Sequence, residues 1–357
     1  MRSWRTALLV ALPVMLAGTA VLLDHAFPPD LSRARTVSAE LRDASGRVLN
    51  LRVAPDGIIR LPPDALGDDI IPLLVSREDR RFWDHPGVDP LALLRAAGQF
   101  AWYGRVVSGG STIAMQVARL LEPHPHTMWG KLHDIARAIQ LQAHLGRAEV
   151  LRLYLTLAPM GGNIEGMRAG ALLYFGHESA DLTRAQAALL VGLPQSPTRR
   201  RPDRYPEAAW RAASRVLVAA GDATPIDVVP VTRAPVPGLA RHLAQHLQGR
   251  SDTTLDGALQ EAVEALADRE VRWLGIDVDI AALIVRNQDR AVLAYLGGTG
   301  FFQPAGMVDH VRAARSPGSA LKPFIYAMAF DTPGAGQPGH LAGRCRAAAG
   351  HLFTARL

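Results

Sequence analysis

The apolar run from Ala7 to Leu23 constrains this chain most, because such a stretch needs either a membrane or a protein core around it. As a helix it would measure about 25 Å, at the short end for crossing a bilayer. Arg2 and Arg5 precede the run and Asp24 follows it, which favours a cytoplasmic N-terminus. A cleaved signal peptide is the alternative, but no clear small-x-small cleavage site follows, so we expect an uncleaved anchor over residues 1–23. The remainder would then face the outside of that membrane.

The charge balance narrows the class of partner. Of 39 basic residues only Lys131 and Lys322 are lysine, and the net charge of +6 favours acidic partners. The arginines are scattered and are not interleaved with aromatics, so we expect no nucleic-acid binding. The single cysteine, Cys345, excludes a disulfide framework and a cysteine-rich zinc site. A length of 357 residues favours two domains.

Periodicity divides the chain into segments. Alternating apolar residues predict a β-hairpin stalk within residues 24–64, with arms near 37–42 and 48–53. Residues 65–215 carry helical periodicity; Leu132, Ile135, Ala136 and Ile139 form one apolar stripe, and 147–157 and 182–193 carry similar ones. We therefore expect a mainly α domain there.

The second half of the chain shows less helical or strand periodicity of its apolar residues. Residues 216–250 include a proline-rich stretch and are predicted to be a linker. Residues 251–330 predict a helix near 257–273 and two strands, Val278–Val285 and Ala291–Leu296. Residues 331–357 have no periodicity and are predicted to be an irregular tail, either flexible or translated out of frame.

Two short motifs in the helical segment favour a site for an anionic ligand. The glycine-rich stretch ending in Ser111 and Thr112 precedes an apolar run, which predicts a helix capped by Ser111 with an anion site at its start. Gln116 and Arg119 follow one to two turns later. Lys131 is conspicuous because the chain otherwise chooses arginine, and a compact cation suits phosphate binding.

The segment 65–215 resembles the lysozyme-like glycosyltransferase domain of the class A penicillin-binding proteins, and its second motif region is most similar to the 1C subtype. The resemblance depends on several ordered motifs: Glu78-Asp79-x-x-Phe82-x-x-His85-x-Gly87, Gly110-Ser111-Thr112-Ile113-x-x-Gln116, Arg147-Ala148-Glu149-Val150-Leu151-x-x-Tyr154-Leu155, Gly162-Asn163-Ile164-Glu165-Gly166, Tyr174-Phe175-Gly176 and Leu193-Pro194-Gln195-Ser196-Pro197. The third motif departs from the family, because Asp134 stands where glutamate is usual.

The resemblance implies a peptidoglycan glycosyltransferase that polymerises lipid II into glycan strands. It implies that Glu78 is the catalytic base and Asp134 a second catalytic carboxylate and metal ligand for Mg²⁺ or another loosely bound divalent cation. Ser111, Thr112, Gln116, Arg119 and Lys131 would bind substrate, and Asp79, Phe82, His85 and Gly87 would support the motif. It further implies a single-pass protein of the inner membrane with its bulk in the periplasm, and other cell-wall synthesis proteins as partners.

A second motif, Ser319-x-x-Lys322, places an amine one helical turn from a hydroxyl, as in a penicillin-binding transpeptidase. Such domains also need Ser-x-Asn and Lys-Thr-Gly, and the residues after Lys322 contain no lysine, asparagine or serine. We therefore expect an incomplete α+β transpeptidase fragment that is inactive. Two alternatives to a glycosyltransferase stay open at this point: a non-catalytic membrane-anchored protein that binds cell-wall precursors or acts as a scaffold, and a soluble lysozyme-like hydrolase.

Overall fold

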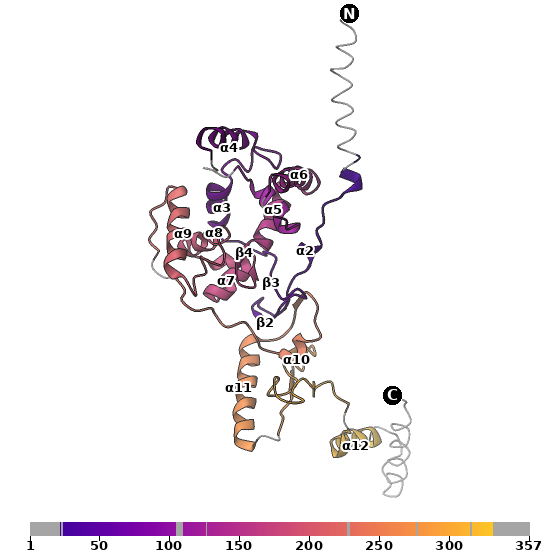
Figure 1. Cartoon of the computed structure of the whole chain (residues 1–357). Coiled ribbons are helices and arrows are strands. Elements are labelled where there is room, and N and C mark those ends of the chain that lie inside the picture. The colour runs from indigo at the N-terminus through magenta and orange to yellow at the C-terminus, as the bar shows by residue number, and fades with distance from the viewer. Residues whose placement is uncertain are drawn as a thin grey trace, which may run out of the picture.

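The computed structural model describes Leu22 and residues 24–330 except 105–109, 126, 227–228, 276–277 and 315 (Figure 1). Apart from Leu22, the predicted anchor of residues 1–23 lies outside the described residues, and so does the predicted tail 331–357. Within the part of the chain that is described, no helix combines the length and apolar character that crossing a bilayer requires.

The N-terminal two thirds of the described chain is mainly helical, as its periodicity predicts. Its helices surround one large hydrophobic core, in which α8 packs against α9 and both contact α3. The helices of this body are α2 (Ser32–Arg35), α3 (Ile70–Glu78), α4 (Pro90–Tyr103), α5 (Ile113–Leu121), α6 (Met128–Leu157), α7 (Met167–Phe175), the 3-10 turn η1 (Ser179–Asp181), α8 (Arg184–Gly192) and α9 (Pro206–Ala219).

The helix predicted from the apolar stripe is present as α6, and Ile135 of this stripe packs against the core. Leu132 and Ile139 are exposed by 52% and 47%, while Asp134 and Ala138 on the adjacent face are buried. The reason is that α5, which packs closely against α6, covers the face that carries Asp134. Gly146, at φ 76° and ψ 169°, interrupts the helix and separates this first part from the buried second part, 147–157.

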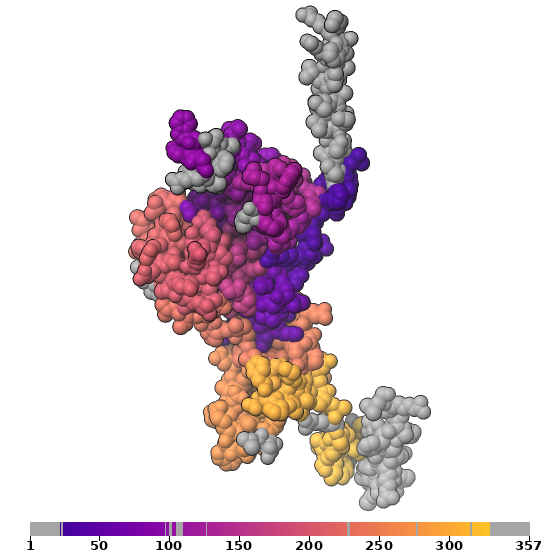
Figure 2. All heavy atoms as spheres, viewed as in Figure 1, coloured from indigo at the N-terminus to yellow at the C-terminus, as the bar shows by residue number. Residues whose placement is uncertain are grey.

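The predicted β-hairpin is confirmed, but it is not a free-standing stalk. Strands β1 (Ala39–Arg42) and β2 (Val48–Arg52) pair antiparallel, and β1 also pairs in parallel with β6 (Arg250–Asp252). The next strand, β3 (Ile59–Arg60), pairs with β5 (Ile164–Glu165), which pairs with β4 (Pro159–Gly161). Residues 24–64 therefore run along the side of the helical body, and the hairpin at their lower end contacts the C-terminal part (Figure 2).

Buried ion pairs fasten the hairpin to the helical body. Arg60 is fully buried and pairs with Glu165 at 2.7 Å, and Arg168 on α7 pairs with Glu40 and Glu178, each at 2.7 Å. Burial lowers the pKa of Arg168, but the hydrogen bonds to Glu178 and Glu40 more than offset this and raise the pKa above its ordinary value. Charges this well partnered satisfy the requirement for burying an ion.

The C-terminal part contains the elements expected from the sequence. A helix, α11 (Gly257–Leu274), begins at the cap Asp256, and β7 (Ala282–Val285) pairs antiparallel with β8 (Val292–Leu296). The remaining elements are α10 (Arg241–Ala244), the 3-10 turn η2 (Gly318–Leu321) and α12 (Lys322–Phe330). A second hydrophobic cluster joins Leu41 and Leu49 of the hairpin to Leu255 and Tyr295 of this part.

Candidate active site

Glu78 is the last residue of α3, and two amide side chains hold its carboxylate. Gln116 on α5 donates a hydrogen bond to Oε2 at 3.1 Å, and Gln195, after α8, donates one to Oε1 at 2.8 Å. The carboxylate is half-buried. Three separate elements thus fix one acidic group in a defined position.

The neighbouring Asp79 connects α3 to the start of α5. Its carboxylate accepts the backbone N–H of Ile113 at 3.0 Å and lies 3.0 Å from Nε2 of His85. Asp79, His85 and Phe82 are all buried. His85 therefore serves as a structural hydrogen-bonding group, which is the role the sequence favoured for it.

The N-cap of α5 is Thr112, and the prediction of Ser111 was wrong. Oγ1 of Thr112 accepts the N–H of Met115 at 3.2 Å and donates to the carbonyl of Gly87 at 2.6 Å. Ser111 is exposed and lies at the mouth of the cavity described below. Serine and threonine are both preferred at an N-cap, so the sequence alone does not decide between Ser111 and Thr112, and the backbone geometry does.

Gly87 allows the loop after α3 to touch α6. Its φ is +99°, and a Cβ built on it would lie 2.4 Å from the carbonyl oxygen of Ala138. Only glycine tolerates both this backbone conformation and this close approach. Gly87 thereby sets the distance between α3, which carries Glu78, and α6, which carries Asp134.

Arg119 and Asp134 form an ion pair across the α5–α6 interface. Asp134 is 1% exposed, whereas the Arg119 side chain is 31% exposed. Lys131 lies three residues before Asp134 on α6 and is half-buried. No hydrogen bond or ion pair is found for the Lys131 amine among the described side chains.

A cavity of about 170 Å³ opens between these groups. Burial raises the pKa of Tyr154 well above its usual range, and the charge of Glu78 raises it further, so the phenol stays protonated beside this carboxylate. The cavity is lined by Ser111, Met115, Gln116, Arg119, Leu120, Asp134, Tyr154, Pro159 and Pro194.

Of the residues singled out from sequence, Glu78, Ser111, Gln116, Arg119 and Asp134 come together at or beside this cavity. Asp79, Phe82, His85, Gly87 and Thr112 form the support beneath it. Gln195 was missed as a partner of Glu78, although the Leu193-Pro194-Gln195 motif was a signal.

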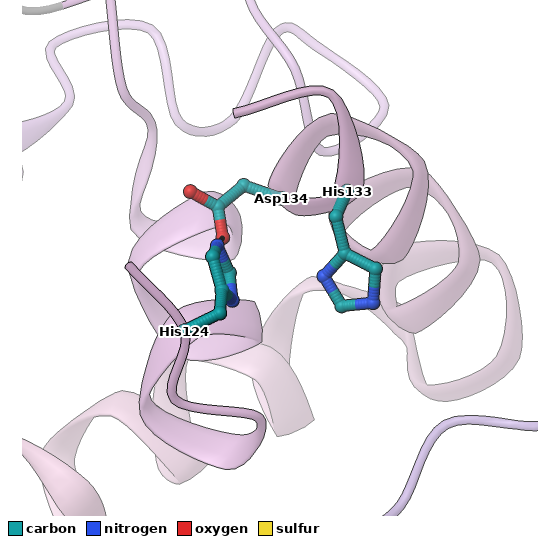
Figure 3. A group of neighbouring side chains, drawn as sticks. All are labelled: His124, His133 and Asp134. Atoms are coloured by element: carbon teal, nitrogen blue, oxygen red, sulfur yellow. Dashed lines mark ion pairs between the residues drawn. The ribbon is translucent and has the colours of Figure 1, made fainter. Parts of the chain in front are cut away.

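Asp134 is also the candidate metal ligand. Its neighbours are His124 and His133, and one ligand atom of each of the three lies within 4.8 Å of the others (Figure 3). Mg²⁺ prefers oxygen ligands, and imidazole nitrogens suit zinc and related metals. The residues around Asp134 therefore do not fit Mg²⁺, although they fit another divalent cation.

The second sequence motif does not form a comparable site. Ser319 lies in η2 and Lys322 begins α12, and both side chains are exposed. Among the described residues, no side-chain hydrogen bond joins the Ser319 hydroxyl to the Lys322 amine. An exposed pair without this contact lacks the activation that a serine nucleophile needs.

The sequence profile of the family described as Transglycosylase matches residues 59–220, which include every residue of the cavity. These residues are a transglycosylase domain. Penicillin-binding protein 1C of Escherichia coli (strain K12) is 39% identical over 347 residues, covering 90% of this chain and 44% of that protein.

Two further relatives support the assignment of this domain. Penicillin-binding protein 1A of Aquifex aeolicus is 33% identical over 197 residues, covering 55% of this chain and 26% of the relative. Penicillin-binding protein 1B of Escherichia coli (strain K12) is 28% identical over 326 residues, covering 80% of this chain and 38% of the relative. The chain thus spans less than half the length of these relatives.

Proposed function

We propose that this domain is a peptidoglycan glycosyltransferase that polymerises lipid II by inverting transfer. The observation that carries the proposal is Glu78, a carboxylate held by two amides, one of which, Gln116, lines a cavity that also contains Arg119 and Asp134. A base beside this cavity and a cation on it match the two requirements of the reaction, which are deprotonation of the acceptor and stabilisation of the departing diphosphate.

Glu78 takes the proton from the 4-hydroxyl of the acceptor sugar. The hydroxyl oxygen then bonds to the anomeric carbon of the donor, and the bond from that carbon to the diphosphate breaks with inversion. The electron pair leaves on the diphosphate, which needs cations and no protonation by an acid. Gln116 and Gln195 keep the carboxylate pointed at the acceptor while this happens.

Arg119 stabilises the departing diphosphate, because its guanidinium lines the cavity and is fixed on one side by Asp134. Lys131, one turn before Asp134 on the same helix, adds a second cation whose amine is uncommitted among the described groups. The shortened carboxylate at Asp134 is buried and paired, so its role here is to orient Arg119.

Exposed apolar side chains at one end of the helical body, where α4 and α6 lie (Figure 1), support the proposal that the substrate carries a lipid. Each of these side chains is more than half exposed, and a group of exposed apolar side chains marks an interaction surface. They are Trp83, Leu91, Leu94, Trp102, Tyr103, Met128, Trp129 and Leu132. We propose that this end faces the inner membrane from the periplasm, with the anchor in residues 1–23 and other cell-wall synthesis proteins as partners.

The test is polymerisation of purified lipid II by the full chain, with Glu78→Gln as the decisive variant. Loss of a general base is expected to reduce the rate by about 10²- to 10⁴-fold. Glu207→Gln is the matched control, because this glutamate is exposed on α9 and pairs with Arg211 on the same helix. Full activity of Glu78→Gln would exclude Glu78 as the base. Binding of lipid II without turnover would favour the non-catalytic alternative, and cleavage of finished glycan would favour a hydrolase.

A further inference from the structure

His124, just before α6, and His133 and Asp134 in its first turns form a cluster (Figure 3), and Asp134 also lines the cavity. Nε2 of His124 lies 3.2 Å from Oδ1 of Asp134. Two ligands of a tetrahedral zinc ion, each about 2.0–2.1 Å from the metal, are separated by about 3.3 Å. This pair therefore already has the spacing of two zinc ligands, and a ligand atom of His133 lies within 4.8 Å of both.

Glu122 engages the second nitrogen of both histidines. Nδ1 of His124 lies 2.8 Å from the Glu122 carbonyl oxygen, and Nε2 of His133 lies 3.0 Å from the Glu122 carboxylate. Histidines that bind metals usually donate their other ring N–H to such an oxygen, which fixes the tautomer and turns the free lone pair toward the metal. One residue thus orients both imidazoles in the manner of a metal site.

The atoms left over are buried and lack hydrogen bonds. Nδ1 of His133 and Oδ1 of Asp134 have no hydrogen-bond partner among the described residues. Asp134 is 1% exposed, and its other oxygen is committed to Arg119. Buried polar atoms without partners are rare because each is costly, and an absent ion is one of the explanations.

Nε2 of His124 faces two acceptor oxygens. With Nδ1–H donated to the Glu122 carbonyl, the lone pair on Nε2 faces the Gly130 carbonyl at 3.0 Å and Asp134 Oδ1 at 3.2 Å. Two further acceptors around one lone pair repel it unless a cation or a second ring proton intervenes. Gly130 permits this crowding, since a Cβ there would lie 2.5 Å from the His124 ring.

We propose that His124, His133 and Asp134 bind one zinc ion, or a divalent metal of similar preference such as cobalt. Two nitrogens and one oxygen suit these metals, whereas Mg²⁺ would require oxygen ligands. The bound ion holds Oδ1 of Asp134 while Oδ2 keeps its pair with Arg119. These metal-binding side chains are positioning residues, since they act on the cavity through the Arg119 guanidinium.

The experiment measures binding to the metal-free full chain, so its outcome is independent of the glycosyltransferase proposal. Isothermal titration with Zn²⁺ is expected to give one site per chain, and Co²⁺ is expected to give the visible absorption of a tetrahedral complex. Mg²⁺ is expected not to compete. Absence of zinc binding, together with nitrogen NMR showing two ring protons on His124, would overturn the proposal in favour of an imidazolium.

Variants separate this site from adventitious surface histidines. His133→Gln keeps an N–H for Glu122 but removes the metal ligand, and Glu122→Gln weakens the support of both histidines. The second change is expected to lower zinc affinity by about 10- to 100-fold, and the first by more. His144→Gln is the matched control, because His144 lies on the same helix, is 44% exposed against 41% for His133, and pairs with Asp24. Equal affinities of the His133 and His144 variants would refute the site; circular dichroism checks that each variant is folded.

Discussion

Replacing Gly87 by alanine tests whether the contact between the loop after α3 and α6 holds the site together. The new Cβ would lie 2.4 Å from the carbonyl oxygen of Ala138, which belongs to helix backbone and cannot rotate away. An L-residue in the left-handed region costs about 1–2 kcal/mol, and overpacking of this kind costs about 1–3 kcal/mol more. The free energy of unfolding should therefore fall by about 2–5 kcal/mol.

Gly46 supplies the control. Its φ of +90° is close to that of Gly87, but a Cβ added there would have nothing within 4 Å. Gly46→Ala therefore carries the backbone strain alone, and the two variants should differ by about 1–3 kcal/mol. Urea denaturation followed by tryptophan fluorescence measures both. Equal losses of stability would refute the claim that contact with α6 makes Gly87 necessary.

The same pair of variants has a functional readout. Ala138 lies one turn beyond Asp134, so pushing α6 away from Gly87 also moves the carboxylate that orients Arg119. Lipid II polymerisation should fall in Gly87→Ala under conditions where the protein remains folded, and Gly46→Ala should retain it. A stable Gly87→Ala protein with full activity would show that the α3–α6 spacing is not critical.

Two further predictions concern other parts of the chain. Hydrogen bonds from Thr224 and Arg184 lower the pKa of Asp222 from 3.8 to about 2, so the ionised carboxylate stabilises the fold above about pH 4 and this contribution is lost as the pH falls toward 2. The Asp222→Asn variant should therefore show a smaller change in the free energy of unfolding between pH 4 and pH 2, and an unchanged profile would contradict the role of these contacts. Labelled penicillin should not acylate the 357-residue chain, because Ser319 and Lys322 are both exposed and unconnected; stoichiometric labelling at Ser319 would contradict this.

Local patterns predicted most of the elements. Helical periodicity indicated the mainly α body, the helix near 257–273 and the buried helix in 182–193, and alternation indicated the hairpin. These signals succeed because each depends on residues close in sequence. The motifs around Glu78, Gln116 and Arg119 likewise come together, since α3 and α5 each carry a compact set of side chains. Their catalytic and binding roles, and the domain boundaries, stay predictions.

The features that the sequence did not predict depend on backbone geometry, which the residue pattern alone does not give. The buried face of α6 follows from where α5 packs, and the choice of Thr112 over Ser111 follows from backbone angles. Gln195 follows α8, which packs against α3, so its contact with Glu78 joins residues separated by 117 positions. The sequence did not indicate His124 as a site residue, because His124 approaches His133 and Asp134 only after the chain reverses direction between α5 and α6.

The pairing of β1 with β6 also fixes when this sheet can be completed during synthesis of the chain. Strand β1 ends at Arg42, and its parallel partner β6 begins at Arg250. A ribosome adding about 5–20 residues per second needs roughly 10–40 s to make the intervening chain. For that interval one edge of the newborn hairpin has no neighbour, so the earliest strand to be synthesised is among the last to be completed.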